Sequence, residues 1–263
     1  MNKILLFIPM YNCEKQIVRV LRQLTGEVCA YISEVIVVNN RSTDHGEEAV
    51  QNYLQKHSVP CVVRLLRNDE NYGLGGSHKV AFQYAVQHGF DYIIVLHGDD
   101  QGRIADFLPL LKSGEYKNYD CCLGARFMKG SKLIGYNNLR IWGNYGFNFL
   151  FSVVVRKTIN DLGSGLNLYK VKTLASEYFL HYPDTLYFND LMILASCYYK
   201  QKMLFYPISW REEDQISNNK LLSFSFSLLK MLCNYILDSK GYLEQDMRIK
   251  KISEYSAQII YEK

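Results

Sequence analysis

The segment after Tyr92–Leu96 carries the residues with the clearest potential for chemistry in this chain. Tyr92–Leu96 is an apolar run, and it ends at His97-Gly98-Asp99-Asp100-Gln101. Acidic side chains at the end of a buried strand are costly unless they meet a cation or another partner. Carboxylate and amide oxygens suit a hard divalent ion such as Mg²⁺ or Mn²⁺, which can stabilise a diphosphate as a leaving group. The alternative is that Asp99 and Asp100 only cap the helix that follows.

Polar residues also follow three earlier apolar runs of the chain. They are Tyr11-Asn12, Asn39-Asn40 and Asn68-Asp69. The carboxyl ends of parallel strands meet at one edge of a sheet, and open sheets bind ligands in the crevice beyond that edge. We therefore expect these residues to lie at the same edge as Asp99.

The first hundred residues alternate between strand patterns and helix patterns. Continuous apolar runs predict buried strands at 4–8, 34–38, 61–66 and 92–96. Helices are expected between them, at 17–24, from the second strand to about His57, and from the loop 73–76 to about His88. This order of elements indicates a mostly parallel sheet with right-handed crossovers, and hence the α/β class.

The second half of the chain is less regular. Its pattern predicts strands at 120–126, 164–171 and 203–208, and helices at 137–155, 189–199 and 221–237. The tail from Asp238 is charged, and we expect it to be helical. No repeat or Pro/Gly linker divides the chain, so we expect one domain over 1–220 and a C-terminal helical appendage over 221–263.

Several segments, in this order on these elements, resemble the motifs of glycosyltransferase family 2. They are Ile8–Glu14, Val37–Asp44, Asn68–Gly76, His97–Gln101, Gly124–Gly130 and Asp161–Leu166. The last two are similar to motifs of the dolichol-phosphate mannose synthase, or polyprenyl-phosphate glycosyltransferase, branch. The resemblance covers about residues 3–220. It implies a single Rossmann-like GT-A domain, with a mostly parallel central sheet flanked by helices, and an inverting enzyme that uses a nucleotide-diphospho-sugar.

The resemblance also implies roles for individual residues of this sequence. The residues expected to bind the nucleotide-sugar are Pro9, Tyr11, Glu14, Asn39, Asn40, Asp69, Lys79, Asp99, Ser164 and Arg211. The residues expected to act in catalysis are Asp99, Arg126 and Asp190. A divalent metal, Mg²⁺ or Mn²⁺, is expected on Asp99, with Gln101 and His97 as further candidate ligands.

Two positions depart from the family's pattern. Asn39-Asn40 stands where the family has an acidic pair, but amides still donate and accept hydrogen bonds. His97 stands where the first aspartate of the family's D-x-D motif is usual. A histidine can bind Mn²⁺, whereas Mg²⁺ prefers oxygen, and the other interpretation is a hydrogen-bonded histidine at a strand end.

The role of Asp190 depends on the acceptor. In this family an acidic residue near this position often deprotonates a sugar hydroxyl, and the alternative is that Asp190 caps a helix. A polyprenyl phosphate, the acceptor type of the resembling branch, is already anionic and needs no such base. Arg211 either closes over the donor's phosphates or belongs to a solvated loop of mixed charge.

Composition excludes several other classes of protein. The net charge of +4 is too small for a general nucleic-acid binder, and 48% hydrophobic residues exclude a disordered chain. Seven cysteines without a CxxC pair make a disulfide framework or a structural zinc site improbable and suggest a reduced cytoplasm. No signal peptide or uninterrupted apolar span is visible.

Two apolar segments suggest a membrane surface. Leu139–Val155 is rich in aromatic residues and flanked by Arg140, Arg156 and Lys157, and Leu221–Leu237 lies beside Lys220 and contains Lys230. Basic-flanked apolar helices suit a membrane interface, although both segments are equally compatible with core helices.

We therefore expect a cytoplasmic, peripheral-membrane glycosyltransferase with a polyprenyl-phosphate or lipid-linked acceptor. The alternatives are transfer to a sugar hydroxyl of a cell-surface polysaccharide and a degenerate nucleotide-sugar-binding protein. A sugar-nucleotide pyrophosphorylase would need a Gly-rich, Arg-containing loop where Pro9–Glu14 stands.

Overall fold

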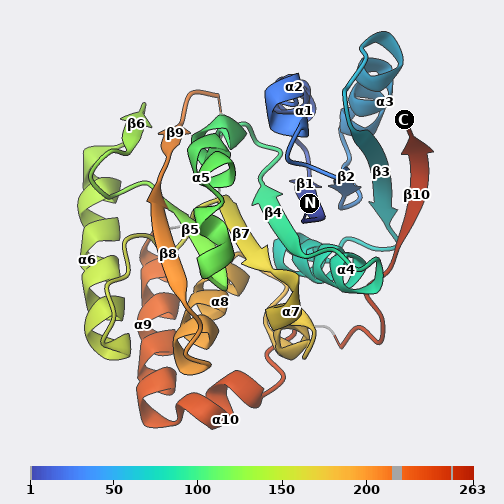
Figure 1. Ribbon diagram of the computed structural model, residues 1–263. Coiled ribbons are helices and arrows are strands. Elements are labelled where there is room, and N and C mark those ends of the chain that lie inside the picture. The colour runs from blue at the N-terminus through green and yellow to red at the C-terminus, as the bar shows by residue number, and fades with distance from the viewer. Residues whose placement is uncertain (1, 215–220, 250) are drawn as a thin grey trace.

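An eight-stranded sheet forms the centre of the molecule (Figure 1). The computed structural model describes residues 2–214, 221–249 and 251–263. The strand order is β10-β3-β2-β1-β4-β7-β5-β8. Their bounds are β1 Ile4–Met10, β2 Glu34–Asn39, β3 Val62–Asn68, β4 Tyr92–Leu96, β5 Cys121–Ala125, β7 Leu166–Lys170, β8 Met203–Pro207 and β10 Ala257–Glu262. A small second sheet pairs β6 Lys132–Ile134 with β9 Ser209–Arg211.

The first four strands pair in parallel, as expected, and antiparallel strands lie beyond them. β1 pairs in parallel with both β2 and β4, and β2 pairs in parallel with β3. β7 is antiparallel to β4 and β5, while β5 and β8 are parallel. The predicted α/β class with a mostly parallel sheet is therefore confirmed.

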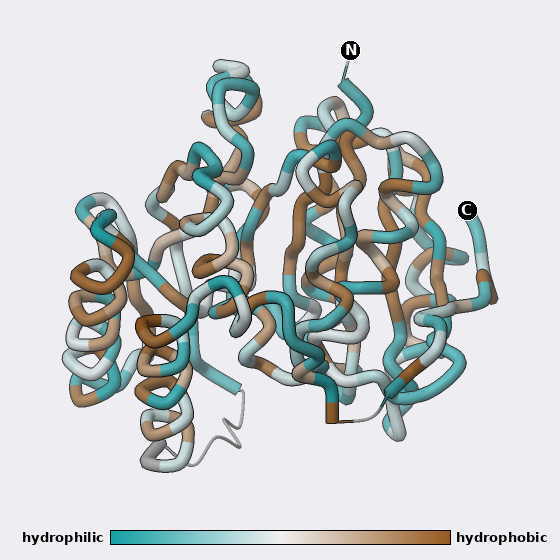
Figure 2. Tube along the Cα trace, turned by 90° about the horizontal axis from the view of Figure 1, so that it is seen from below, coloured by the Kyte–Doolittle hydropathy of each residue, from teal (hydrophilic) through white to brown (hydrophobic). Residues whose placement is uncertain are grey.

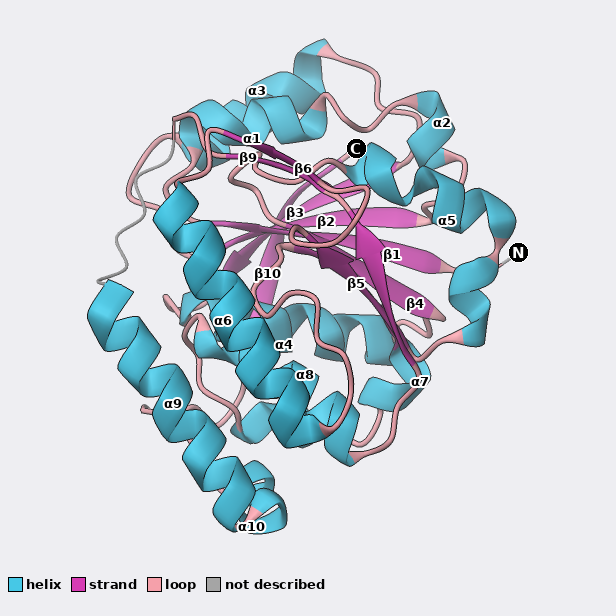
Figure 3. Ribbon diagram, turned by 90° about the vertical axis from the view of Figure 1, so that its left-hand side faces the viewer, coloured by secondary structure: helices cyan, strands magenta, loops and turns pink. Residues whose placement is uncertain are grey.

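Helices cover both faces of the central sheet (Figure 3). One face carries α1 Glu14–Leu21, α2 Gly26–Cys29, α3 Gly46–Lys56 and α5 Leu108–Ser113. The other carries α4 Gly73–Gln87, α6 Asn138–Val155, α7 Val171–Leu174, α8 Tyr187–Tyr198, α9 Leu221–Leu237 and α10 Ser239–Glu244. Short 3₁₀ turns lie at Ile104–Phe107, Glu115–Asn118 and Tyr178–His181.

The sheet separates two hydrophobic cores. Phe7 packs with residues of α4 and α8, whereas its neighbour Leu6 packs with residues of α1 and α3 on the opposite face. Successive side chains of a strand point to opposite faces, so a strand covered on both sides reads as a continuous apolar run. Figure 2 shows the hydrophobic residues concentrated along the strands, and β1 is buried over its whole length.

The predicted loop at 73–76 is wrong, because α4 begins at Gly73. Gly73 has φ +74, and a Cβ on either Gly73 or Gly75 would collide with the backbone at Pro183–Asp184. The glycines therefore allow the first turn of the helix to pack closely against that segment.

The tail also differs from the prediction. Within the described part of the tail, only Ser239–Glu244 is helical, and Ala257–Glu262 forms β10, which pairs antiparallel with β3 (Figure 1). The end of the predicted helical appendage thus belongs to the central sheet, because β3 would otherwise leave an edge of unpaired backbone groups. The predicted boundary at 220 lies outside the described residues. Within the described ranges, no helix has the length and hydropathy needed to span a membrane.

Candidate active site

The predicted site residues come together mainly at one edge of the sheet. Met10 pairs with Asn39 at the carboxyl ends of β1 and β2. The backbone N–H of Gly98 donates to the carbonyl of Pro9 over 3.1 Å, and that of His97 donates to the carbonyl of Gly165 over 3.0 Å. The segments that contain Tyr11, Asn40, Asp99 and Ser164 are therefore neighbours at this edge.

Asp99 lies at this edge as a half-buried carboxylate. Its Oδ1 accepts a hydrogen bond from the backbone N–H of Gln101 over 3.2 Å. Burial raises the pKa of Asp99 to about 6, which the backbone hydrogen bonds and the more distant Arg126 offset only in part. Among the described residues Asp99 forms no ion pair, so a cation bound there would relieve the cost of its desolvated charge.

Asp100 has a different environment from its neighbour. It is 2% exposed, its φ is +60°, and its Oδ2 pairs with Arg19 Nε at 2.6 Å and with the guanidinium of Arg211. Arg211 also donates from Nε to the Asp100 carbonyl over 2.8 Å. Asp100 is thus the centre of an ion-pair cluster, and it holds Arg211 beside the loop that carries Asp99 and Gln101.

His97 lies beneath Asp99 in a crowded environment. A Cβ on Gly165 would come within 2.6 Å of the imidazole, so only glycine leaves room for it. Burial, with a further effect from Arg126, lowers the pKa of His97 to about 4, so the ring is neutral at pH 7. In the part of the chain that the structure describes, its Nε2 has no hydrogen-bond partner.

The donor atoms at this edge do not form a complete metal cage. No group of three or more His, Cys, Asp or Glu side chains that could hold a metal ion occurs among residues 2–214, 221–249 and 251–263. The Asp99 carboxylate, the Gln101 amide and the free Nε2 of His97 nevertheless suit an ion that takes its other ligands from a diphosphate.

Arg126 is buried and paired rather than free. Its Nε and Nη2 donate to the two carboxylate oxygens of Asp161, each over 2.7 Å, and its backbone N–H donates to the same carboxylate. The guanidinium carbon lies 5.0 Å from the ring centre of Phe127 and 5.1 Å from that of Trp210. Asp161 therefore fixes Arg126, a role that sequence reasoning missed although Asp161 stands in a quoted motif.

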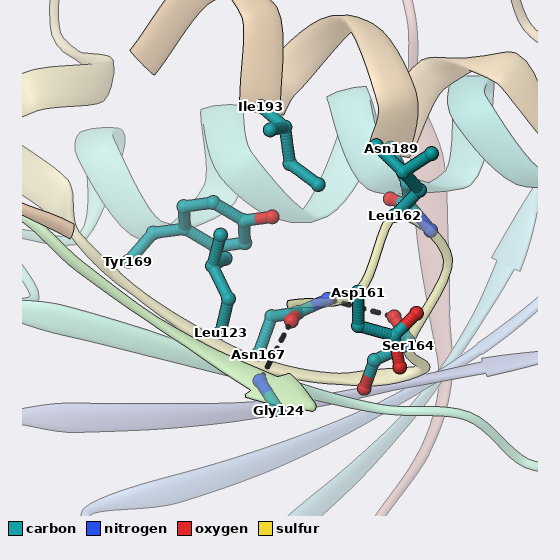
Figure 4. A pocket seen from close by; sticks show the side chains of 9 residues that line it. All are labelled: Leu123, Gly124, Asp161, Leu162, Ser164, Asn167, Tyr169, Asn189 and Ile193. Atoms are coloured by element: carbon teal, nitrogen blue, oxygen red, sulfur yellow. Dashed lines mark hydrogen bonds between the residues drawn. The ribbon is translucent and has the colours of Figure 1, made fainter. Parts of the chain in front are cut away.

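Asp161 also lines a small cavity (Figure 4). Its volume is about 10 Å³, roughly the space for one water molecule, so it cannot hold a sugar. The Asn167 amide bridges its wall: Oδ1 accepts from the Gly124 N–H over 3.2 Å, and Nδ2 donates to the Ser164 carbonyl over 2.8 Å. Ser164 is buried, and its Oγ accepts from the Leu166 N–H over 3.2 Å.

Asp190 lies in α8 and is 3% exposed. Burial, and secondarily the charge of Asp161, raises its pKa well above the usual range for an aspartate. Burial therefore favours the neutral form of its carboxyl group. The alternative interpretation, that Asp190 caps the helix, is wrong, because α8 begins at Tyr187 and its N-cap residue is Leu186.

Asn39 and Asn40, which stand where the family has an acidic pair, are hydrogen-bonded to neighbouring residues. Asn39 donates from Nδ2 to Glu47 Oε2 over 2.7 Å and accepts from the Ser42 N–H over 2.9 Å. Asn40 Oδ1 accepts from Asn68 Nδ2 and from the Tyr72 N–H, over 3.0 and 2.8 Å. These contacts fix the loops that follow β1, β2 and β3, and the two amides themselves add no negative charge there.

The remaining residues expected near the nucleobase are more accessible. Tyr11 is 49% exposed and directly follows β1, in which Pro9 is buried. Glu14 Oε2 accepts only a long hydrogen bond, of 3.3 Å, from the His45 N–H. Tyr11 and Glu14 therefore remain open to a ligand at this edge.

The expectation that Lys79 reaches the nucleotide is corrected by its contacts. Lys79 is 0% exposed, and its Nζ donates to the Tyr182 carbonyl, to Asp184 Oδ1 and to the Tyr255 hydroxyl, over 2.5, 2.7 and 3.0 Å. All three donors of its ammonium group are used, so Lys79 anchors the C-terminal segment instead.

Asp69 also serves the C-terminal segment. Its carboxylate accepts from Ser256 Oγ over 2.5 Å and from Gln258 Nε2 over 3.1 Å. Both partners belong to a segment that lies far away in the sequence, so Asp69 holds the approach to β10 in place beside the end of β3.

Comparison with known proteins decides the family. Residues 6–176 match the model of glycosyl transferase family 2. The chain belongs to this family. The predicted resemblance is thereby confirmed.

Two relatives of this family 2 chain have names that state an activity. The chain is 23% identical over 173 residues to the undecaprenyl-phosphate mannosyltransferase of Micrococcus luteus. The matched region covers 65% of this chain and 68% of that protein. The chain is 29% identical over 175 residues to a dolichyl-phosphate beta-glucosyltransferase of Trichomonas vaginalis, covering 62% and 50%. The chain spans between 50% and 68% of the length of the relatives it matches.

Solved structures agree with the GT-A fold. Glucosyl-3-phosphoglycerate synthase from Mycobacterium tuberculosis, in complex with UDP, superposes with a TM-score of 0.62 at 12% identity, over 89% of this chain and 80% of that one. At this identity the likeness establishes the fold of this family 2 protein and no more.

Proposed function

We propose that the protein transfers a sugar, with inversion, from a nucleotide-diphospho-sugar to a polyprenyl phosphate or another lipid-linked acceptor. Membership of glycosyl transferase family 2 and the names of the polyprenyl-phosphate relatives support this proposal. The observation that carries it is the contrast between two carboxyl groups. Asp99 is accessible at the edge of the sheet, whereas Asp190 is 3% exposed and burial raises its pKa well above the usual range for an aspartate.

A divalent metal would bind on the donor side of the proposed site. Asp99 and Gln101 would hold it, with the neutral His97 imidazole as a further ligand. When bound, the ion neutralises charge on the diphosphate leaving group. Arg211, held beside this loop by Asp100, would contribute a second positive charge to the diphosphate.

The state of Asp190 favours an acceptor that is already anionic. A sugar hydroxyl must lose a proton as it attacks, whereas Asp190 is 3% exposed and its burial favours the neutral carboxyl, which accepts no proton. A phosphate monoester carries its own negative oxygen, so its attack on the anomeric carbon needs no base from the protein. Transfer to a sugar hydroxyl is the second candidate.

We further propose that α6 and α9 rest on the inner face of an anionic membrane. The two helices contact each other and lie side by side (Figure 3). Trp142 is 74% exposed and Phe226 is 71% exposed. The other exposed apolar residues of these helices are Leu139, Tyr145, Phe149, Leu150, Val153, Leu229, Ile236 and Leu237.

Basic residues border part of this apolar surface. Arg156, Lys157 and Lys230 are exposed near it, whereas Arg140 is paired with Glu212 at 2.7 Å. Lys220 lies outside the described residues. Exposed apolar rings gain free energy from burial in a membrane interface, and exposed lysines and arginines attract anionic headgroups.

The test is a transfer assay with a panel of UDP-, GDP-, CDP- and dTDP-sugars and a polyprenyl phosphate in phosphatidylglycerol vesicles, with and without Mn²⁺. We expect one labelled sugar to enter the lipid fraction in a metal-dependent reaction. Binding of a donor without any transfer or hydrolysis would indicate the degenerate binding protein instead. Transfer only to added oligosaccharides would favour the hydroxyl acceptor.

Vesicle binding is tested separately by co-sedimentation. Trp142→Asp and Phe226→Asp should each weaken sedimentation with anionic vesicles. Val62→Asp, which changes an exposed apolar residue at the start of β3, is the matched control. Equal sedimentation of all three variants and the native protein would contradict the proposed surface.

A further inference from the structure

Cys29 and Cys61 lie side by side although they are far apart in the sequence. Cys29 is the last residue of α2, and Cys61 immediately precedes β3. Their Sγ atoms are 2.8 Å apart across 32 positions of the chain. Since a disulfide bond is about 2.05 Å long, the two sulfurs need to approach by less than about 1 Å to form one.

This arrangement distinguishes the two residues from the other cysteines. The chain has seven, all with free thiols. In the described ranges, no other pair of cysteine sulfurs lies within hydrogen-bonding distance. Cys121 and Cys122 are adjacent, but both are fully buried in β5, where successive side chains point to opposite faces.

The pair is accessible from one side. Cys29 is buried and Cys61 is half-buried, so a small molecule can reach the sulfur of Cys61. The two thiols share a hydrogen bond, which lowers the pKa of Cys29 and, together with burial, raises that of Cys61, and the thiolate is the reactive form of cysteine. The pair precedes β3, so it lies at the amino-terminal edge of the sheet, opposite Asp99.

We propose that Cys29 and Cys61 form a redox-modification site, which closes to an intramolecular disulfide by exchange with a small-molecule disulfide. One cysteine thiolate attacks a sulfur of that disulfide, forms a mixed disulfide and releases one thiolate. The second cysteine loses its proton and attacks the protein-side sulfur, which releases the second thiolate. The protein is oxidised by two electrons, and the small disulfide is reduced to two thiols.

The cross-link would act on stability rather than on the sheet edge with Asp99. The closed loop contains β2, which ends at Asn39, and α3, with Asn40 between them. Closing a loop of this size restricts the unfolded chain, and in a domain of this size we expect the melting temperature to rise by about 5–10 °C. This expectation is independent of the proposed transfer reaction.

The experiment exposes the whole native chain to oxidised glutathione, alkylates the remaining thiols and maps the peptides by mass spectrometry. We expect one peptide cross-linked between Cys29 and Cys61, whereas the exposed Cys233 carries only a glutathione adduct. Cys61→Ser should abolish the cross-link and the rise in melting temperature. Cys29→Ser should leave Cys61 as a glutathione adduct.

Cys197→Ser is the matched control, because Cys197 is half-buried like Cys61 but lies in α8. It should keep both the cross-link and the rise in melting temperature. Two results would overturn the proposal. One is full reaction of Cys233 with no cross-linked peptide. The other is an equal rise in melting temperature for Cys61→Ser and the native protein.

Discussion

Aspartate has opposite environments at the open edge of the sheet and in the buried layer of side chains between the sheet and α8. Asp99 follows β4 at the edge, where its pKa is raised only to about 6 and its carboxylate can meet a ligand. Asp190 lies inside α8, where burial and the charge of Asp161 raise its pKa well above the usual range. The same side chain therefore differs in charge preference according to how far water and ligands can reach it.

The buried layer is a structural support for the edge. Asp161 holds Arg126 through two hydrogen bonds of 2.7 Å, and the buried ring of His78 packs against Phe7, Phe82 and Phe188. Groups of this layer contribute to stability and to orientation, while those at the edge contact the ligand. Four predictions test this division.

The largest effect is expected for Asp99→Asn. The substitution keeps the shape of the side chain but removes the charge that would hold the metal and diphosphate. We expect transfer to fall by about 10³-fold or more, with an unchanged melting temperature. Asp91→Asn, at the opposite end of β4, should keep normal turnover. Native turnover by folded Asp99→Asn would remove this residue from the mechanism.

Asp161→Asn should act on stability. It leaves the Arg126 guanidinium buried without its counter-charge, and we expect the free energy of unfolding to fall by about 3 kcal/mol. Urea denaturation measures this loss. The double variant Arg126→Met with Asp161→Leu removes both charges and should recover part of it. A loss below about 1 kcal/mol in Asp161→Asn would contradict a buried, mutually dependent pair.

Acid should destabilise the fold through the two buried histidines. Burial lowers the pKa of His78 to about 3 and that of His97 to about 4, below the ordinary value of 6.5. At a pH between these lowered pKa values and 6.5, the unfolded chain therefore binds more protons than the folded chain. The free energy of unfolding consequently falls as the pH drops below about 6.5. From pH 7 to pH 5 we expect each histidine to cost about 2 kcal/mol.

Urea midpoints of a histidine variant check this expectation. His78→Phe keeps a ring against Phe7 and Phe188 and should reduce the loss of stability between pH 7 and pH 5. His57→Phe changes an exposed histidine and controls for the substitution itself. Identical pH dependence in His78→Phe and the native protein would show that His78 is not buried in its neutral form.

The smallest effect is expected for Asp190→Asn. Burial favours the neutral form of its carboxyl group, so the amide should change transfer to a polyprenyl phosphate by less than about tenfold, whereas a positioned base contributes about 10²–10⁴-fold. Turnover numbers with saturating donor measure the effect. If Asp190→Asn is as inactive as Asp99→Asn, Asp190 acts as a base and the sugar-hydroxyl acceptor becomes the better proposal.

Much of the fold and part of the site could be predicted from local pattern. β1, β2 and β4 are apolar runs buried on both faces, and their ends placed Asn39-Asn40 and Asp99 at the correct edge. Each of these inferences needs only neighbouring residues, because a buried strand and the turn that follows it are specified within about ten positions.

Other features had no local signal. Lys79 binds Asp184 and Tyr255, Asp161 pairs with Arg126, and the sulfur of Cys29 lies beside that of Cys61. In each case the two partners are more than thirty positions apart in the sequence. β10 was expected to be helical, since its partner β3 lies far upstream. Periodicity records which face of an element is buried, not which distant side chain it will meet there.

The sequence by itself determined the α/β class, the parallel order of the first strands and the family motifs, because all of these follow from residue type and spacing along the chain. Only the tertiary structure decided the charge state of Asp190, the fixed position of Arg126 and the partners of Lys79. The physical reason is that desolvation and pairing depend on what surrounds a group in space. An aspartate has the same chemistry in every sequence, but its pKa depends on whether water, a cation or an apolar helix lies beside it.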